Sequence, residues 1–152
     1  MARVEQTRTY PGLDQRAAWE YLMDLHHLPE WYASLSEVID PDARWSEPGD
    51  RFRFFYGLLG RRMEVECVLD EVQAPLMLRY TAKTRWLPDV HFRWQHTVLA
   101  DGFATTVLME TDEPTSVFGK AVDRMLVPRL LERDLSRSLD NLADIFTVGP
   151  PD

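Results

Sequence analysis

Apolar residues recur at intervals of three and four along the last third of the chain. Because this spacing places side chains on one stripe of a helix, it predicts a long amphipathic helix within residues 116–146. The stripe consists of Phe118, Val122, Met125, Leu131, Leu135, Leu139, Leu142 and Phe146. Pro128 interrupts the pattern, so we expect either a kink or a short helix over 116–126 followed by a longer one from about residue 128. Gly149, Pro150 and Pro151 then end the helix.

The middle of the chain has a different period. From about Glu37 to Glu113, apolar and polar residues alternate between turn signals, which is typical of strands with one covered and one solvated face. We expect a first strand over 2–10, two short helices from Asp14 and from near Pro29, and then strands over 51–56, 61–71, 76–85, 90–99 and 104–111. A four-residue turn at 57–60 would place Phe54 and Tyr56 on the face of Met63 and Val65.

These elements predict an α+β architecture of the helix-grip type. A curved antiparallel sheet of about seven strands would wrap round the long C-terminal helix, with the two short helices after the first strand. A chain of 152 residues is long enough for one domain, which we place over 1–148, with a tail over 149–152.

Charge and composition exclude several classes of partner. The formal net charge of −8 argues against nucleic acid, whose phosphates require a basic surface, and against a polybasic membrane anchor. No run of 18 apolar residues is present, so we expect no membrane span. The single cysteine, Cys67, excludes an internal disulfide and suits a reducing compartment, so we expect a cytoplasmic protein.

The order of elements and several local motifs resemble a known superfamily. The motifs are Asp24 followed by Leu28-Pro29-Glu30-Trp31-Tyr32, then Gly49-Asp50-Arg51-Phe52, Pro75 before a strand, and Asp101-Gly102 before Thr105-Thr106-Val107. They resemble the START-like, or SRPBCC, superfamily with the helix-grip fold, and within it the chain is most similar to the polyketide cyclase/dehydrase and lipid-transport group. The resemblance covers nearly the whole chain, and its motifs mark the fold and not a catalytic signature.

The resemblance implies a cavity between the sheet and the long helix. Members of the superfamily typically bind hydrophobic small molecules such as sterols, lipids, polyketides or quinones in that cavity. In this sequence its candidate lining consists of Phe54, Tyr56, Val65, Cys67, Tyr80, Trp94, His96, Met109, Leu131 and Leu135.

Two loops with apolar tips would lie at one end of the sheet, beside the link 112–115 into the long helix. Loop tips are normally polar, so these residues predict a pocket mouth or a docking patch. They are Leu58, Leu59, Trp86, Leu87 and Pro88. A homodimer or a protein partner could use such a patch. Alternatively, Leu58 and Trp86 simply pack on the long helix.

Three residues are candidates for acid–base chemistry. His96, on an apolar strand face, is either a hydrogen-bonded core histidine or a general acid/base beside Tyr80. Glu110 is either a solvent-facing charge or a pocket carboxylate. We expect no cofactor.

A metal site is a weaker possibility. His26, His27 and Glu30 have near-helical spacing, but adjacent histidines point in different directions and Pro29 intervenes. We therefore expect no metal.

The sequence leaves three hypotheses open. The first is a carrier or binding protein for a lipid, polyketide or quinone-like molecule, because no catalytic constellation is evident. The second is an enzyme of polyketide cyclase, aromatase or dehydratase type, which would use the same cavity and proton transfer by His96, Tyr80 or Glu110. The third is a protein-interaction domain similar to the chaperone activators of the superfamily.

Overall fold

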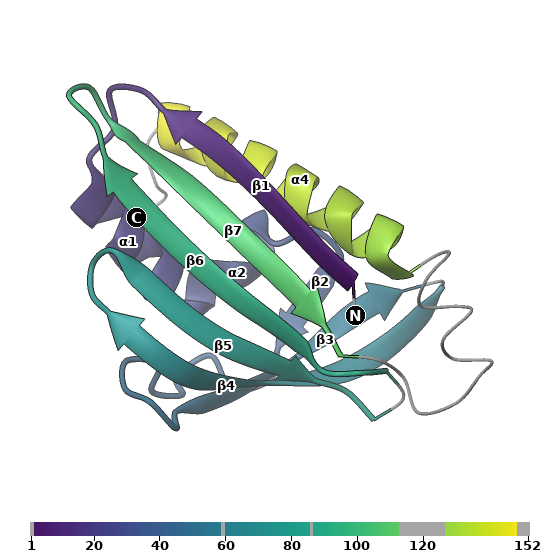
Figure 1. Cartoon of the computed structure of the whole chain (residues 1–152). Coiled ribbons are helices and arrows are strands. Elements are labelled where there is room, and N and C mark those ends of the chain that lie inside the picture. Colours follow the sequence, from purple (N-terminus) through teal and green to yellow (C-terminus); the bar gives the residue numbers. More distant parts are fainter. Residues whose placement is uncertain (1, 59, 86, 113–126, 149–152) are drawn as a thin grey trace.

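The computed structural model describes residues 2–58, 60–85, 87–112 and 127–148. Within these ranges, seven strands form one antiparallel sheet in the order β1-β7-β6-β5-β4-β3-β2 (Figure 1). The strands are β1 (Ala2–Tyr10), β2 (Leu35–Val38), β3 (Arg51–Leu58), β4 (Arg61–Gln73), β5 (Met77–Lys83), β6 (Val90–Val98) and β7 (Phe103–Thr111).

The helices cover the concave side of this sheet. The short helices α1 (Gln15–Met23), η1 (Leu25–His27) and α2 (Leu28–Trp31) follow β1, and the long helix α4 (Val127–Val148) runs beside it (Figure 1). Asp14 caps α1 as predicted, because its side chain accepts a hydrogen bond from the Arg16 amide at 3.0 Å. The predicted helix-grip architecture is confirmed. The predicted helical segment 116–126 lies outside the described residues.

The register of β3 and β4 confirms which side chains share a face. Phe54 pairs with Val65, and Tyr56 pairs with Met63. The predicted four-residue turn at 57–60 was too long, because the strands continue pairing as far as Leu58. Gly57 stays in β3, where its amide also donates to the Ser34 carbonyl at 2.8 Å. The shorter turn leaves the parity of the register unchanged.

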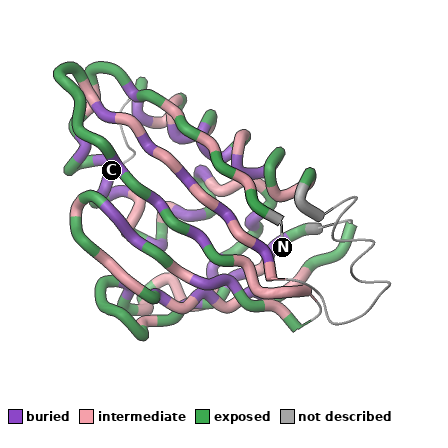
Figure 2. The backbone as a smooth tube through the Cα atoms, in the orientation of Figure 1, coloured by how far each residue is buried: buried purple, intermediate pink, exposed green. Residues whose placement is uncertain are grey.

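Burial alternates along the strands, as expected for a sheet covered on one face (Figure 2). In β7 the inward residues Phe103, Val107 and Met109 are almost fully buried, while their neighbours retain surface. The apolar face of α4 meets them through residues that are also buried: Leu135, Leu139, Leu142 and Phe146.

Hydrogen bonds connect α4 to the end of β1 and to the segment around the end of α2. The Tyr10 hydroxyl donates to the Leu139 carbonyl at 3.0 Å. The Ser138 hydroxyl accepts from the Ala33 amide at 2.8 Å, and the Asn141 side-chain amide donates to the Trp31 carbonyl at 3.0 Å. These bonds hold α2 and the start of β2 against the helix, over the concave face of the sheet. Among the described helices, none combines the length and apolar character needed to cross a membrane.

Candidate functional site

An apolar cavity lies between the sheet, the segment from α2 to β2, and the first turns of α4. Its volume is about 70 Å³. Since a cavity needs about 10–15 Å³ to hold one water, it has room for about five waters, or one aromatic ring. Its polar groups among the described residues are the hydroxyls of Tyr32, Tyr56, Tyr80, Thr84 and Thr111.

Many of the residues proposed from the sequence line this cavity together. From the predicted lining they are Phe54, Tyr56, Val65, Cys67, Tyr80 and Leu131, and from the predicted mouth they are Leu87 and Pro88. Leu59 and Trp86 lie outside the described residues, and so does the side chain of Leu58. The β5–β6 connection does lie beside the end of β7, where the Asp112 amide donates to the Asp89 carbonyl at 3.0 Å.

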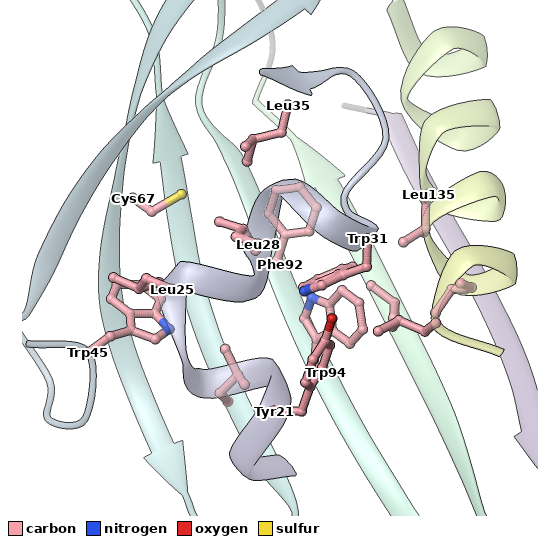
Figure 3. Close-up of a cluster of buried hydrophobic side chains, with 14 of the residues drawn as sticks. Tyr21, Leu25, Leu28, Trp31, Leu35, Trp45, Cys67, Phe92, Trp94 and Leu135 are labelled. Atoms are coloured by element: carbon pink, nitrogen blue, oxygen red, sulfur yellow. The ribbon is translucent and has the colours of Figure 1, made fainter. Parts of the chain in front are cut away.

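Four residues of the predicted lining lie elsewhere in the interior: Trp94, His96, Met109 and Leu135. Met109 and Leu135 are each 3% exposed and pack in the core around the cavity. Figure 3 shows Leu135 extending from α4 toward the short helices. All four point inward, as the alternation predicted, but the cavity occupies only part of the inner layer.

Sequence reasoning missed the contribution of the α2–β2 segment. Leu28, Tyr32 and Leu35 all line the cavity, because this segment folds back over the sheet and does not merely connect β1 to the rest. Their spacing of four and three residues is the signal that could have found them.

A second, smaller cavity of about 40 Å³ adjoins the first. Leu28, Phe52 and Tyr80 line both cavities, so the two cavities meet at these side chains. Trp31 and Trp94 line the second cavity, with ring centroids 5.6 Å apart (Figure 3). We call the first cavity the outer chamber and the second the inner chamber. Together they have room for about two fused rings.

A buried carboxylate lies behind the outer chamber. The Tyr56 hydroxyl donates to Asp134 Oδ2, and Asp134 is only 3% exposed. Asp134 Oδ1 has no hydrogen-bond partner among the described residues, and Arg133 Nε is 4.0 Å away. Sequence reasoning missed Asp134, although it lies three residues after Leu131 and therefore on the apolar stripe of the helix.

Burial keeps the tyrosines of the chamber protonated. Desolvation is the main cause that raises the pKa of Tyr32 and of Tyr56 well above the ordinary tyrosine value, and the Asp134 carboxylate raises both further. Each phenol is therefore a neutral hydrogen-bonding group at physiological pH. Desolvation also raises the pKa of the Cys67 thiol, so this cysteine has no nucleophilic thiolate at neutral pH.

His96 lies in solid core away from the outer chamber. Its ring stacks on Phe103 with centroids 5.2 Å apart and meets the edge of Trp19 at 5.7 Å. Neither ring nitrogen has a hydrogen-bond partner among the described residues. The predicted hydrogen bond of this core histidine is therefore wrong. Burial lowers the pKa of His96 to about 4, which leaves the ring neutral at pH 7.

Glu110 lies on the face of the sheet opposite the two chambers. It alternates with the buried residues Met109 and Thr111 and borders a polar surface groove that also includes Glu71 and Arg79. Its position separates it from the other two acid–base candidates.

The histidines near α2 form an exposed network of hydrogen bonds. His26 lies between Asp24 and Asp42, with a distance of 2.9 Å to each, and His27 is 3.2 Å from Glu30. Among the residues described, no group of three or more His, Cys, Asp or Glu side chains is arranged to hold a metal ion.

Comparison with known proteins places this geometry in a defined class. The fold is shared with an aromatase/cyclase, Zhui, from Streptomyces sp. R1128 (15% identity, TM-score 0.75, covering 96% of this chain and 93% of that one). The di-domain aromatase/cyclase StfQ of the steffimycin pathway is similar over 96% of this chain and 51% of its own (15% identity, TM-score 0.74). TTHA0849 from Thermus thermophilus is similar over 99% and 100% (17% identity, TM-score 0.78).

These structural similarities establish a helix-grip protein. The sequence then assigns the family: residues 1–147 match the family described as polyketide cyclase / dehydrase and lipid transport, and the chain belongs to it. No curated protein matches the chain.

Proposed function

We propose that this protein binds a hydrophobic aromatic molecule of one or two rings that carries a hydroxyl group. The observation that carries the proposal is an apolar, aromatic-lined cavity next to a buried tyrosine–carboxylate pair. On this proposal the protein acts as a carrier or binding protein. The family description covers both polyketide cyclases and lipid transport, and the aromatase/cyclase neighbours favour a ligand of polyketide type.

The size and lining of the cavity favour an aromatic ligand. Phe52, Phe54 and Phe92 offer ring faces and edges to a planar molecule, and such aromatic pairs contribute about 0.5–1.5 kcal/mol each beyond area burial. The outer chamber alone accommodates about one ring, and a second ring extends into the inner chamber.

The Tyr56–Asp134 pair supplies the polar end of the site. A carboxylate oxygen accepts hydrogen bonds, and the oxygen of Tyr56 retains a lone pair while its hydrogen is donated to Asp134. A ligand hydroxyl would donate to this pair. A ligand without a donor would leave Asp134 Oδ1 unpaired, so the pair favours phenols and enols over plain hydrocarbons.

Titration of the protein with 2-naphthol tests the proposal. Val65 lines the outer chamber, and Val65→Trp fills it, so we expect affinity to fall more than about 100-fold while the protein stays folded. Val68 lies on the other face of the same strand, and Val68→Trp is the matched control that keeps wild-type affinity. Equal affinity of the two variants would contradict the location of the site.

A second candidate is catalysis of polyketide cyclisation or dehydration in the same cavity. The observation that favours it is the unpaired Oδ1 of Asp134, since a desolvated carboxylate near a bound chain can act as a general base. Asp134 would take a proton from a carbon between two carbonyls. The resulting carbanion would attack a second carbonyl of the same chain, and the new alkoxide would recover the proton.

Turnover of a short poly-β-ketone thioester separates the two candidates. If the protein is an enzyme, Asp134→Asn abolishes formation of the cyclised product, while the amide oxygen of the new side chain still accepts a hydrogen bond from 2-naphthol. If the protein is a carrier, neither wild type nor variant accelerates the reaction over solvent. Unchanged turnover in Asp134→Asn would rule out the base role of Asp134.

A further inference from the structure

The inner chamber carries a feature that the proposed function does not use. Trp31 is 4% exposed, and its indole Nε1 has no hydrogen-bond partner among the described residues. A buried donor without an acceptor is rare in native structures, and it usually marks a place that a water, an ion or a ligand completes. Trp31 lines the inner chamber, so the unpaired donor and an empty space occur together.

The other indole of the chamber is already paired. Trp94 Nε1 donates to the Tyr80 hydroxyl at 3.2 Å, and this bond positions Tyr80 where the two chambers meet. The remaining lining is mainly apolar and includes Leu25 and Leu78. The described residues of the inner chamber contain no acidic or basic side chain, so the chamber suits a neutral group.

We propose that the inner chamber binds a carbonyl oxygen of the ligand, with Trp31 Nε1 as its hydrogen-bond donor. A carbonyl is a neutral acceptor that brings no hydrogen of its own, so it satisfies Trp31 without creating a new unpaired donor. This inference rests on the proposed function and adds a second polar contact. The ligand then carries a hydroxyl at the end near Tyr56 and Asp134 and a carbonyl at the other end, as a hydroxyaryl ketone or hydroxyquinone does.

The two contacts together orient the ligand. The Tyr56–Asp134 pair accepts a hydrogen bond and Trp31 donates one, so a molecule with one hydroxyl and one carbonyl fits in one direction only. Tyr80, Leu28 and Phe52 lie where the ligand passes from one chamber to the other. A molecule confined to the outer chamber does not reach Trp31, so the inner chamber selects for length as well as for the carbonyl.

A pair of matched compounds tests the subsite. The compounds 6-acetyl-2-naphthol and 6-ethyl-2-naphthol share the ring system and the hydroxyl and differ in the carbonyl. Their affinities are measured for wild type and for Trp31→Phe, which removes the N–H and keeps an aromatic ring. We expect the ratio of ketone affinity to ethyl affinity to fall about tenfold in Trp31→Phe, the loss typical of one buried hydrogen bond.

Trp19→Phe is the matched control. Trp19 is buried, packs against His96 and lines neither chamber, so the same substitution there leaves the ratio unchanged. A ratio unchanged in Trp31→Phe, with 6-ethyl-2-naphthol still bound, would overturn the subsite and leave the proposed function standing. Failure of both compounds to bind wild type would overturn the proposed function and the subsite with it.

A readout on the wild-type protein keeps the proposal testable if Trp31→Phe does not fold. The indole proton of Trp31 is followed by ¹H–¹⁵N spectroscopy during each titration. A carbonyl that accepts from Nε1 moves this resonance downfield with the ketone and not with the ethyl compound. Equal movement with both compounds, as a resident water or a general packing change would give, contradicts the inference.

Discussion

Among the described residues, three buried side chains carry unpaired polar atoms, and two of them, Asp134 and His96, lie at opposite ends of the inner layer. Asp134 accepts a hydrogen bond from Tyr56, which lies opposite Met63 in the neighbouring strand, near the β3–β4 turn. His96 pairs with Thr105 near the β6–β7 turn. Each is 3% exposed. What separates them is the neighbouring space: Tyr56 borders a cavity, whereas the ring of His96 is stacked on Phe103 in solid core.

This difference shows how to interpret an unpaired buried atom. Tyr56 lines the outer chamber, and on our proposal a ligand hydroxyl there supplies the missing partner of Asp134, so the cost of the unpaired oxygen is recovered on binding. His96 lines neither chamber, so a ligand bound there does not supply its missing partners, and they remain a cost to the folded state. The first group is a candidate for function, and the second is a candidate for acid sensitivity.

The largest expected effect is the acid sensitivity that His96 imposes on stability. Its pKa is about 4 in the folded protein and about 6.5 when unfolded, so the unfolded chain binds the extra proton between these values. The contribution of His96 to stability is complete above pH 6.5 and is lost as pH falls through 4, by about 3 kcal/mol in total.

Urea denaturation at several pH values checks this sign. The free energy of unfolding of wild type should fall between pH 6.5 and 4 by about 3 kcal/mol more than that of His96→Phe, which has no titrating group at this position. Other carboxylates titrate in both proteins and cancel in the difference. Parallel pH profiles for the two proteins would show that His96 is not held neutral by burial.

The next effect concerns the hydrogen bond inside the site. Tyr56→Phe leaves the Asp134 carboxylate without its described donor, and we expect a loss of about 2 kcal/mol of stability, as for hydrogen bonds to charged groups. Tyr10→Phe removes a bond to the neutral Leu139 carbonyl and should cost about 1 kcal/mol. The two values come from the same denaturation experiment. A smaller loss for Tyr56→Phe than for Tyr10→Phe would contradict the hydrogen bond between Tyr56 and the Asp134 side chain.

The smallest effect is a gain of stability in the solid core. At pH 7, His96→Phe replaces two unpaired nitrogens by carbon at similar shape, and we expect a gain of about 1 kcal/mol. His91→Phe is the control, because His91 lies within 3.0 Å of both Thr81 Oγ1 and Asp112 Oδ1 on the outer face. Thermal unfolding of both variants measures the difference. A loss of stability in His96→Phe would mean that the ring nitrogens have partners in solution.

Periodicity predicted the fold in nearly all its parts, because alternation and helical spacing act locally. It placed Phe54, Tyr56 and Val65 on one concave face, and the register agrees. It could not place the cavity within that face. Whether an inward residue lines a space or fills one depends on the volumes of side chains from distant elements, so Met109 was proposed for the lining although it packs in the core.

The missed residues have one physical cause. Asp134 and Trp31 lie on helices, and Tyr32 directly follows α2, and the sequence patterns of these segments were interpreted from apolar residues alone. A carboxylate on an apolar stripe, or a short helix that folds back over the sheet, becomes informative only when tertiary contacts supply the neighbour, as Tyr56 does for Asp134. Glu110, by contrast, was left open between two faces, and the alternation of β7 resolves it.

Intermolecular nuclear Overhauser effects between bound 2-naphthol and methyl-labelled protein test the central claim most directly. Val65 and Leu131 line the outer chamber, whereas Val107 and Leu139 lie in solid core. The account predicts contacts from the naphthol ring to the methyl groups of Val65 and Leu131 and none to the core pair. Contacts confined to the exposed Val98, or no contacts at saturating naphthol, would contradict a binding cavity between the sheet and α4.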